Sequence, residues 1–327
     1  MHLAVAVFDF PTLARNGFLY DDSFYDFQIA RHIAHGDGPS FDGVHLTNGF
    51  QPLYVLALVP MYWAAGSNDT LPIHAALVLS ALLSVATAYL LYRILVRRVS
   101  EVVAIAAAAA WSFAPIVMRQ TANGLETALA AFMFAATVCF YLEKVRPEAH
   151  VGRGRAVAMG ALAGLCIMAR ADLVFLVLAL CLDHLLVRRQ RRAGPGWRSE
   201  VAVAGAVCLL VCLPWMVYGA MAVGSPFPES GRATRFLALA YAPFFELGPR
   251  SMTTDGPTPS FIATHVERSF DTLKVTPVFH PFFRASSKLG EHLHIARAAE
   301  WMTDVVGLAL LVVLGVWWRK RRRSPRG

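Results

Sequence analysis

Long apolar runs separated by short polar connections dominate this chain from residue 52 onward. A run of about 20 apolar residues can cross the hydrocarbon core of a bilayer as a helix, and soluble domains rarely contain one. The pattern therefore predicts an all-α integral membrane protein, built as a polytopic helix bundle. The predicted spanning segments are 71–95, 101–118, 124–142, 155–169, 171–187, 200–223 and 303–318.

Two further apolar stretches, near the N-terminus, are shorter. Segment 52–65 contains Pro52 and Pro60. Its length favours a helix lying at the membrane interface over a span. Segment 1–14 is counted as a short first span, which brings the predicted total to about eight spans.

Basic residues gather in the connections between the apolar segments, and this predicts the topology. Short loops rich in arginine and lysine normally stay in the cytoplasm. Each interval between basic clusters holds an even number of predicted spans, so one assignment satisfies all of them. Both termini are then cytoplasmic, and residues 15–70, the turns at 119–123 and near Arg170, and the loop 224–302 are external. The clusters are Arg97 and Arg98; Lys144, Arg146, Arg153 and Arg155; Arg188, Arg189, Arg191, Arg192 and Arg198; and residues 319–323.

The composition supports a chain that has the lipid bilayer as its solvent. Hydrophobic residues make up 56% of the chain and charged residues 16%, with a mean hydropathy of +0.49, outside the usual range of soluble domains. The net charge of +8 comes from the connecting clusters rather than from one basic domain, so we expect no nucleic-acid partner. The five cysteines lie in apolar segments without metal-ligand spacing and are interpreted as small buried hydrophobic residues.

Polar residues of the predicted external loop 15–70 form the first candidate site. Asp21 and Asp22 precede a stretch whose aromatic and aliphatic residues indicate an amphipathic helix along the membrane surface, closed by Gly36 and Gly38. One aspartate can cap that helix by accepting backbone N–H bonds. The second is then free for another role, so capping and catalysis both remain open.

Three more polar groups lie near predicted external turns. Glu126 and Asn123 are at the start of a span, where a carboxylate is favoured by the helix dipole whether or not it is functional. Arg170 and Asp172 interrupt a long apolar run, and charges at that depth usually face a protein interior or a wet cavity. Arg170 either binds a phosphate in a bidentate manner or is neutralised by Asp172.

The third group follows segment 200–223. Ser230, Gly231 and Arg232 offer a hydroxyl, an accessible backbone N–H and a cation. Such a set suits an oxyanion or phosphate, and it is equally typical of an ordinary polar turn.

Together these motifs resemble the GT-C superfamily of membrane glycosyltransferases. The superfamily includes dolichyl-phosphate-mannose protein mannosyltransferases, lipid A aminoarabinose transferases and mycobacterial arabinofuranosyltransferases. The resemblance covers residues 1–235, while the short first helix and the single span after residue 302 suggest a truncated or divergent member. The matching elements are Tyr20-Asp21-Asp22, the helix end Ala30-Arg31-His32-Ile33-Ala34-His35-Gly36, the segment Thr47-Asn48-Gly49-Phe50-Gln51-Pro52-Leu53-Tyr54, the element Asn123-Gly124-Leu125-Glu126-Thr127-Ala128-Leu129, and Pro214-Trp215 with Pro228-Glu229-Ser230-Gly231.

The resemblance implies an activity and a domain organisation. We expect a sugar to move from a polyprenyl-phosphate donor to a hydroxyl of a glycan, lipid or protein acceptor, by inverting direct displacement, at the external face of a bacterial inner membrane, for the cell envelope. Residues 1–235 would form the transmembrane catalytic module, including the external loop 15–70. Residues 236–302 would form a second external loop, and residues 303–327 the last span and a basic tail.

The resemblance also implies roles for individual residues. Asp21 matches the family's catalytic base, Asp22 would orient the acceptor or hold a divalent cation with Asp21, and Glu126 would reach the same pocket. The resemblance leaves a divalent cation open as the only expected cofactor. The substrate-binding candidates are Arg170, Arg232 and Arg119 for phosphate, Asn48 and Gln51 for sugar hydroxyls, and Asn123, Asp172 and Ser230 around them.

Two other classes of protein remain in consideration. A transporter or lipid flippase also carries charges in membrane segments, although it should hold them near the bilayer midplane rather than along one rim. The other alternative is a catalytically inactive scaffold with the glycosyltransferase architecture.

Overall fold

The structure is a computed structural model that describes residues 5–15, 18–148, 150–190 and 196–229, together with two short strands. It divides into two units, Met1–Ala233 and Thr234–Gly327. In the second unit, strand β1 (Met252–Thr253) pairs antiparallel with β2 (Gly256–Pro257). The predicted span 303–318 and the predicted site residues Ser230 and Arg232 lie outside the described residues.

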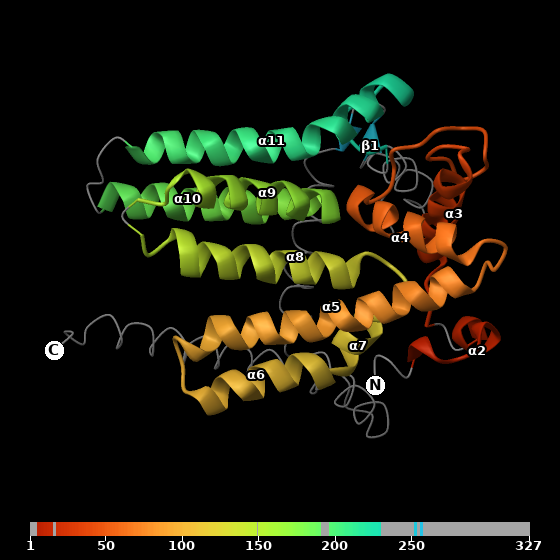
Figure 1. The fold of residues 1–327 in the computed structure, drawn as a ribbon, viewed down its shortest axis with the longest axis horizontal. Helices are drawn as coiled ribbons and strands as arrows, with labels where there is room; N and C mark the ends of the chain where they lie inside the picture. The colour runs from red at the N-terminus through yellow and green to blue at the C-terminus, as the bar shows by residue number, and fades with distance from the viewer. Residues whose placement is uncertain are drawn as a thin grey trace. The chain divides into compact units, whose positions relative to one another are not determined.

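The first unit is built mainly of helices in its described part, as the apolar pattern predicted (Figure 1). The helices are α2 (Phe10–Arg15), α3 (Asp21–His35), α4 (Pro52–Ala65), α5 (Leu71–Val96), α6 (Glu101–Phe113), α7 (Pro115–Thr121), α8 (Thr127–Phe140), η1 (Tyr141–Val145), α9 (Arg153–Ala169), η2 (Ala171–Leu173), α10 (Val174–Gln190) and α11 (Gly196–Ala222).

Three helical stretches of the described chain are long and apolar enough to cross a membrane. They are Leu71–Val96, Thr127–Val145 and Trp197–Ala222. Helices α9 and α10 have 17 residues each, or about 25 Å at the usual rise per residue. The helices of the first unit are thus those of a membrane protein, and the total of about eight spans stays a prediction.

The predicted span 101–118 is two helices in the structure. Helix α6 ends at Phe113, and Ala114 is extended, with φ −63° and ψ 122°. The reason is Pro115, whose ring disfavours a helical conformation at the residue before it, while its fixed φ suits the first turn of α7.

Helices α9 and α11 approach closely through glycines. A Cβ on Gly160 would lie 2.3 Å from the Ala204 carbonyl oxygen, and one on Gly164 would lie 2.7 Å from the Val211 Cβ. Small residues spaced four apart let membrane helices bring their backbones together. This contact therefore depends on the absence of two side chains.

The two ends of the first unit differ in chemistry. Figure 1 shows α3 and α4 at one end, with the α5–α6 and α8–α9 connections at the other. Ion pairs join the helices at that second end: Glu143 binds Arg93, and Asp183 binds Arg146 at 2.8 Å. Asp21 and Asp22 therefore lie at the end opposite the basic cluster of Arg97 and Arg98, although which end is external stays a prediction.

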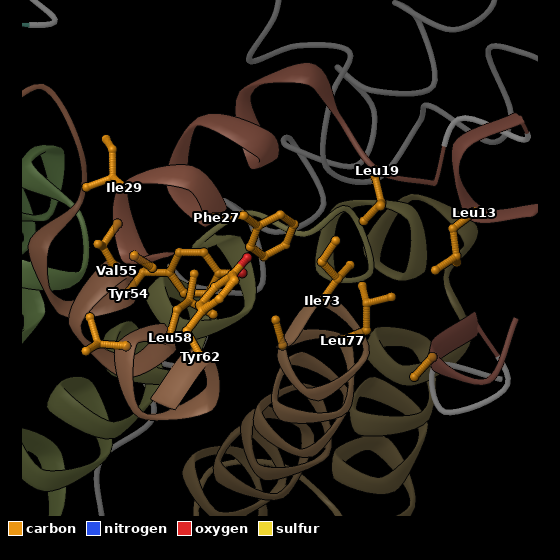
Figure 2. Close-up of a cluster of buried hydrophobic side chains, with 14 of the residues drawn as sticks. Leu13, Leu19, Phe27, Ile29, Tyr54, Val55, Leu58, Tyr62, Ile73 and Leu77 are labelled. Carbon is orange, nitrogen blue, oxygen red and sulfur yellow. The ribbon is translucent and has the colours of Figure 1, made fainter. Parts of the chain in front are cut away.

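An apolar core fixes α3 and α4 at their end of the bundle (Figure 2). Phe27 and Ile29 of α3 pack in the same cluster as Tyr54 and Leu58 of α4, and the exposed fraction of each is 3% or less. Ile73 of α5 joins them. The start of α3 is thus held in place by a packed apolar core.

Candidate carboxylate and arginine site

The turn before α8 contacts the residue that precedes α3. The backbone N–H of Tyr20 donates to the Asn123 carbonyl oxygen at 3.2 Å, and the buried Tyr54 hydroxyl of α4 donates to the Gly124 carbonyl oxygen at 2.7 Å. Gly124 has a φ of +79°, and a Cβ there would lie 3.0 Å from the Ser23 Cβ. Only glycine meets both requirements without strain, so the Asn-Gly pair is explained by packing.

The Asn123 side chain belongs to the turn itself. The residue is fully buried, and its Oδ1 accepts the Leu125 backbone N–H at 3.0 Å. A short side chain that bonds the backbone two residues ahead stabilises a tight turn. This geometry supports a structural role for Asn123, whose predicted contact with substrate stays a prediction.

Glu126, Arg170 and Asp172 form an ion-paired network, which we call the arginine network. Arg170 Nη1 donates to Glu126 Oε1 at 3.1 Å, and its Nε lies 3.1 Å from both Asp172 carboxylate oxygens. Burial raises the pKa of Glu126, the Asp172 and Asp22 carboxylates add to the rise, and Arg170 opposes it. Of the two interpretations of Arg170, this pairing fits neutralisation by carboxylates.

Gln51, the N-cap residue of α4, joins the same network. Its Oε1 accepts the Ala171 backbone N–H at 3.3 Å. The side chain thus ties the start of α4 to the turn between α9 and η2. Because that contact uses the amide oxygen, the amide nitrogen is the part of Gln51 available for a sugar hydroxyl.

Asp21 and Asp22 are exposed in the first turn of α3. Asp21 Oδ1 accepts the Asp22 backbone N–H at 3.0 Å. The negative charge of Asp22 raises the pKa values of both Asp26 and Glu126, so Asp22 lies close enough to influence them. Asp22 therefore lies toward the arginine network, while one carboxylate oxygen of Asp21 is used in a hydrogen bond to the backbone.

Asp26 lies close to Asp22 and Glu126, and sequence reasoning missed it. Its side chain lies on α3 one turn after Asp22, with an exposed fraction of 6%. Burial, with contributions from Glu126 and Asp22, raises the pKa of Asp26 to about 8. The missed signal was an aspartate four residues after another, directly before the apolar residues of an amphipathic helix.

Arg119 differs from Arg170 in its surroundings. The exposed Arg119 guanidinium lies over the Tyr20 ring, 6.0 Å from its centroid. No carboxylate of the described chain forms an ion pair with it. Its charge is therefore open to an anionic ligand, next to the residue that precedes Asp21.

Asn48 is committed to the protein backbone. It is fully buried. Its Nδ2 donates to the carbonyl oxygens of Ser225 and Phe227 at 2.9 and 3.1 Å, and its Oδ1 accepts the Glu229 N–H at 3.0 Å. We call this set the Asn48 latch. It fastens residues 225–229 beside the segment before α4, which favours a structural role over the predicted reading of sugar hydroxyls.

The cavity between α9, α10 and α11 is separate from these residues. It has a volume of about 350 Å³ and a mostly apolar lining, with His184 and Glu200 among its walls, and no predicted site residue lines it. In the described part of the chain, no three His, Cys, Asp or Glu side chains are grouped so as to hold a metal ion. The role of Asp21 and Asp22 as metal ligands stays an open prediction.

Comparison with known proteins bears on this arrangement. The model of the family described as dolichyl-phosphate-mannose-protein mannosyltransferase matches residues 68–218, which include Arg119, Glu126, Arg170 and Asp172. No curated protein and no solved structure matches the chain. The family match confirms the resemblance drawn from the sequence motifs: with its apolar helices, this chain is similar over residues 68–218 to the membrane glycosyltransferases of the GT-C superfamily.

Proposed function

We propose that the chain transfers a sugar from a polyprenyl-phosphate donor to an acceptor hydroxyl, at the end of the bundle that carries α3. The observation that carries the proposal is the proximity of Asp22 to the arginine network, which brings together the start of α3, the turn before α8 and the turn after α9. A site at the end of apolar helices suits a donor whose isoprenoid tail stays in lipid. Mannose is the first sugar to test, because the matching family is described by that donor.

The proposed chemistry is a direct displacement. A carboxylate takes the proton of the acceptor hydroxyl while the oxygen attacks the anomeric carbon, and the bond to the phosphate breaks with inversion. The resemblance assigns this base to Asp21. The influence of Asp22 on Glu126 makes Asp22 the second candidate, to be tested beside it.

The leaving phosphate requires a positive group near it. Arg170 shares its charge between Glu126 and Asp172, so a phosphate would have to compete with two carboxylates. Arg119 has no such competitor among the described residues and packs on Tyr20. We therefore propose Arg119 as the first phosphate ligand, with the arginine network organising the site.

The test is a transfer assay with the full chain in liposomes. Polyprenyl phosphate carrying radiolabelled mannose is the donor, an envelope fraction lacking this protein supplies acceptors, and label leaving the lipid extract is counted. Asp21→Asn and Asp22→Asn should each be compared with Asp37→Asn, the same change at an exposed residue just after α3. Losing the base should lower transfer by about 100-fold or more.

Each result has a definite meaning. Transfer that persists in both Asp21→Asn and Asp22→Asn would remove the aspartate pair from the proposal. Movement of labelled lipid across the liposome without transfer would favour a flippase. Neither transfer nor movement with any polyprenyl-phosphate sugar would favour the inactive scaffold.

A further inference from the structure

Asp26 is a buried acidic group that the proposed displacement does not use. Asp26 lies on α3 with an exposed fraction of 6%, and no arginine, lysine or histidine of the described residues forms an ion pair with it. A charged carboxylate without a partner is very costly in such surroundings. Burial therefore favours the neutral acid.

The charged groups around Asp26 favour the same form. Asp22 on α3 and Glu126 before α8 both raise the pKa of Asp26, which reaches about 8. Tyr54 of α4 also faces it, and the negative charge of Asp26 raises the pKa of Tyr54 after the larger effect of burial. Arg170, the cation of the arginine network, is paired with Glu126 and Asp172 rather than with Asp26.

We propose that Asp26 is a positioning residue that works as a neutral carboxylic acid, keeping Glu126 paired with Arg170, and that losing its proton disables the site. This inference rests on the proposed function. While Asp26 is neutral, it adds no negative charge to that of Glu126 beside Arg170. An ionised Asp26 adds a second buried negative charge next to Glu126, which repels Glu126 and an incoming phosphate alike.

The first experiment does not depend on transfer. Infrared difference spectra of the purified full chain at pH 6 compare the wild type with Asp26→Asn, which keeps the shape of the side chain without a titrating proton. The carbonyl band of a protonated carboxylic acid should be lost in Asp26→Asn and retained in Asp37→Asn. An unchanged band in Asp26→Asn means that Asp26 is ionised, and that result overturns the proposal.

The second experiment uses the transfer assay with the mannose donor over a range of pH. Wild-type transfer should fall by about tenfold per unit above pH 8, as expected when one group must stay protonated. Asp26→Asn should stay within about threefold of the wild type at pH 6.5 and lose that alkaline fall. A folded Asp26→Asn without activity at any pH, or one that retains the alkaline fall, contradicts the positioning role.

The two experiments separate the two ideas. If no transfer is found but the acid band disappears in Asp26→Asn, the proposed function fails while the neutral buried acid stands. If transfer is found and the band is unchanged, the proposed function stands while the neutral buried acid fails. Asp26→Leu, which removes the polar group altogether, shows whether any loss in Asp26→Asn comes from folding alone.

Discussion

The Asn48 latch gives the sharpest test of the architecture, because every hydrogen-bonding group of one buried amide is committed to a known partner. Asn48→Asp keeps the oxygen that accepts the Glu229 N–H and removes both donors to Ser225 and Phe227. Each lost hydrogen bond is worth about 1 kcal/mol, and a carboxylate facing two carbonyl oxygens adds a desolvation penalty. We expect the free energy of unfolding to fall by about 3 kcal/mol.

A matched control lies elsewhere in the chain. Asn68 uses only its Oδ1, which accepts from the backbone and hydroxyl of Thr70 and from the backbone of Leu71. Asn68→Asp keeps that acceptor and puts a negative charge at the start of α5, where the helix dipole favours it. Its unfolding temperature should therefore be unchanged or slightly higher.

The assay is thermal unfolding in detergent, followed by tryptophan fluorescence, with limited proteolysis of the segment around residue 227. Asn48→Asp should unfold at least about 5 °C below the wild type and be cleaved faster near Phe227. Equal shifts in Asn48→Asp and Asn68→Asp would refute the reasoning, because only Asn48→Asp loses hydrogen bonds that the amide donates.

Three further predictions follow from the packing and the charges. Gly160→Ala should destabilise the chain by about 1–3 kcal/mol, because its Cβ would meet the Ala204 carbonyl oxygen. In the same thermal assay Gly205→Ala, with nothing within 4 Å of its Cβ, should be neutral or stabilising. Gly124→Ala should strain the turn by about 1–3 kcal/mol. It should lower transfer even at temperatures where the variant is still folded. The pKa of the Asp26 carboxyl rises from 3.8 to about 8 on folding, so the folded wild type loses stability as pH increases through that window. Asp26→Asn should therefore flatten the pH dependence of the unfolding temperature.

Much of this architecture follows from patterns that act over short distances. The long apolar runs predict α5, α8 and α11, because a chain segment in lipid must form all its backbone hydrogen bonds internally, as a helix does. They do not predict the break at Ala114, where one proline outweighs an unbroken apolar run. Nor do they establish how many of the shorter helices cross the bilayer, because length and composition alone leave the 17-residue helices α9 and α10 undecided.

The site was less predictable, because its chemistry comes from contacts across the chain. The sequence places Glu126 and Arg170 near external turns, and the structure joins them at 3.1 Å, 44 positions apart. The resemblance implies a substrate contact for Asn48, yet the backbone partners of its side chain are 177 to 181 residues away. No local pattern shows which polar side chains a distant backbone segment will occupy.

Asp26 shows how the two kinds of information combine. The sequence places an aspartate on α3, and the structure buries it, where it is tolerated only with a partner or as a neutral acid. The structure supplies no cation for Asp26 among the described residues and surrounds it with Asp22 and Glu126. The partner explanation therefore fails for the described chain, and the neutral acid remains. Asparagine has nearly the same shape and no proton to lose, which is why the comparison of the wild type with Asp26→Asn tests function as well as folding.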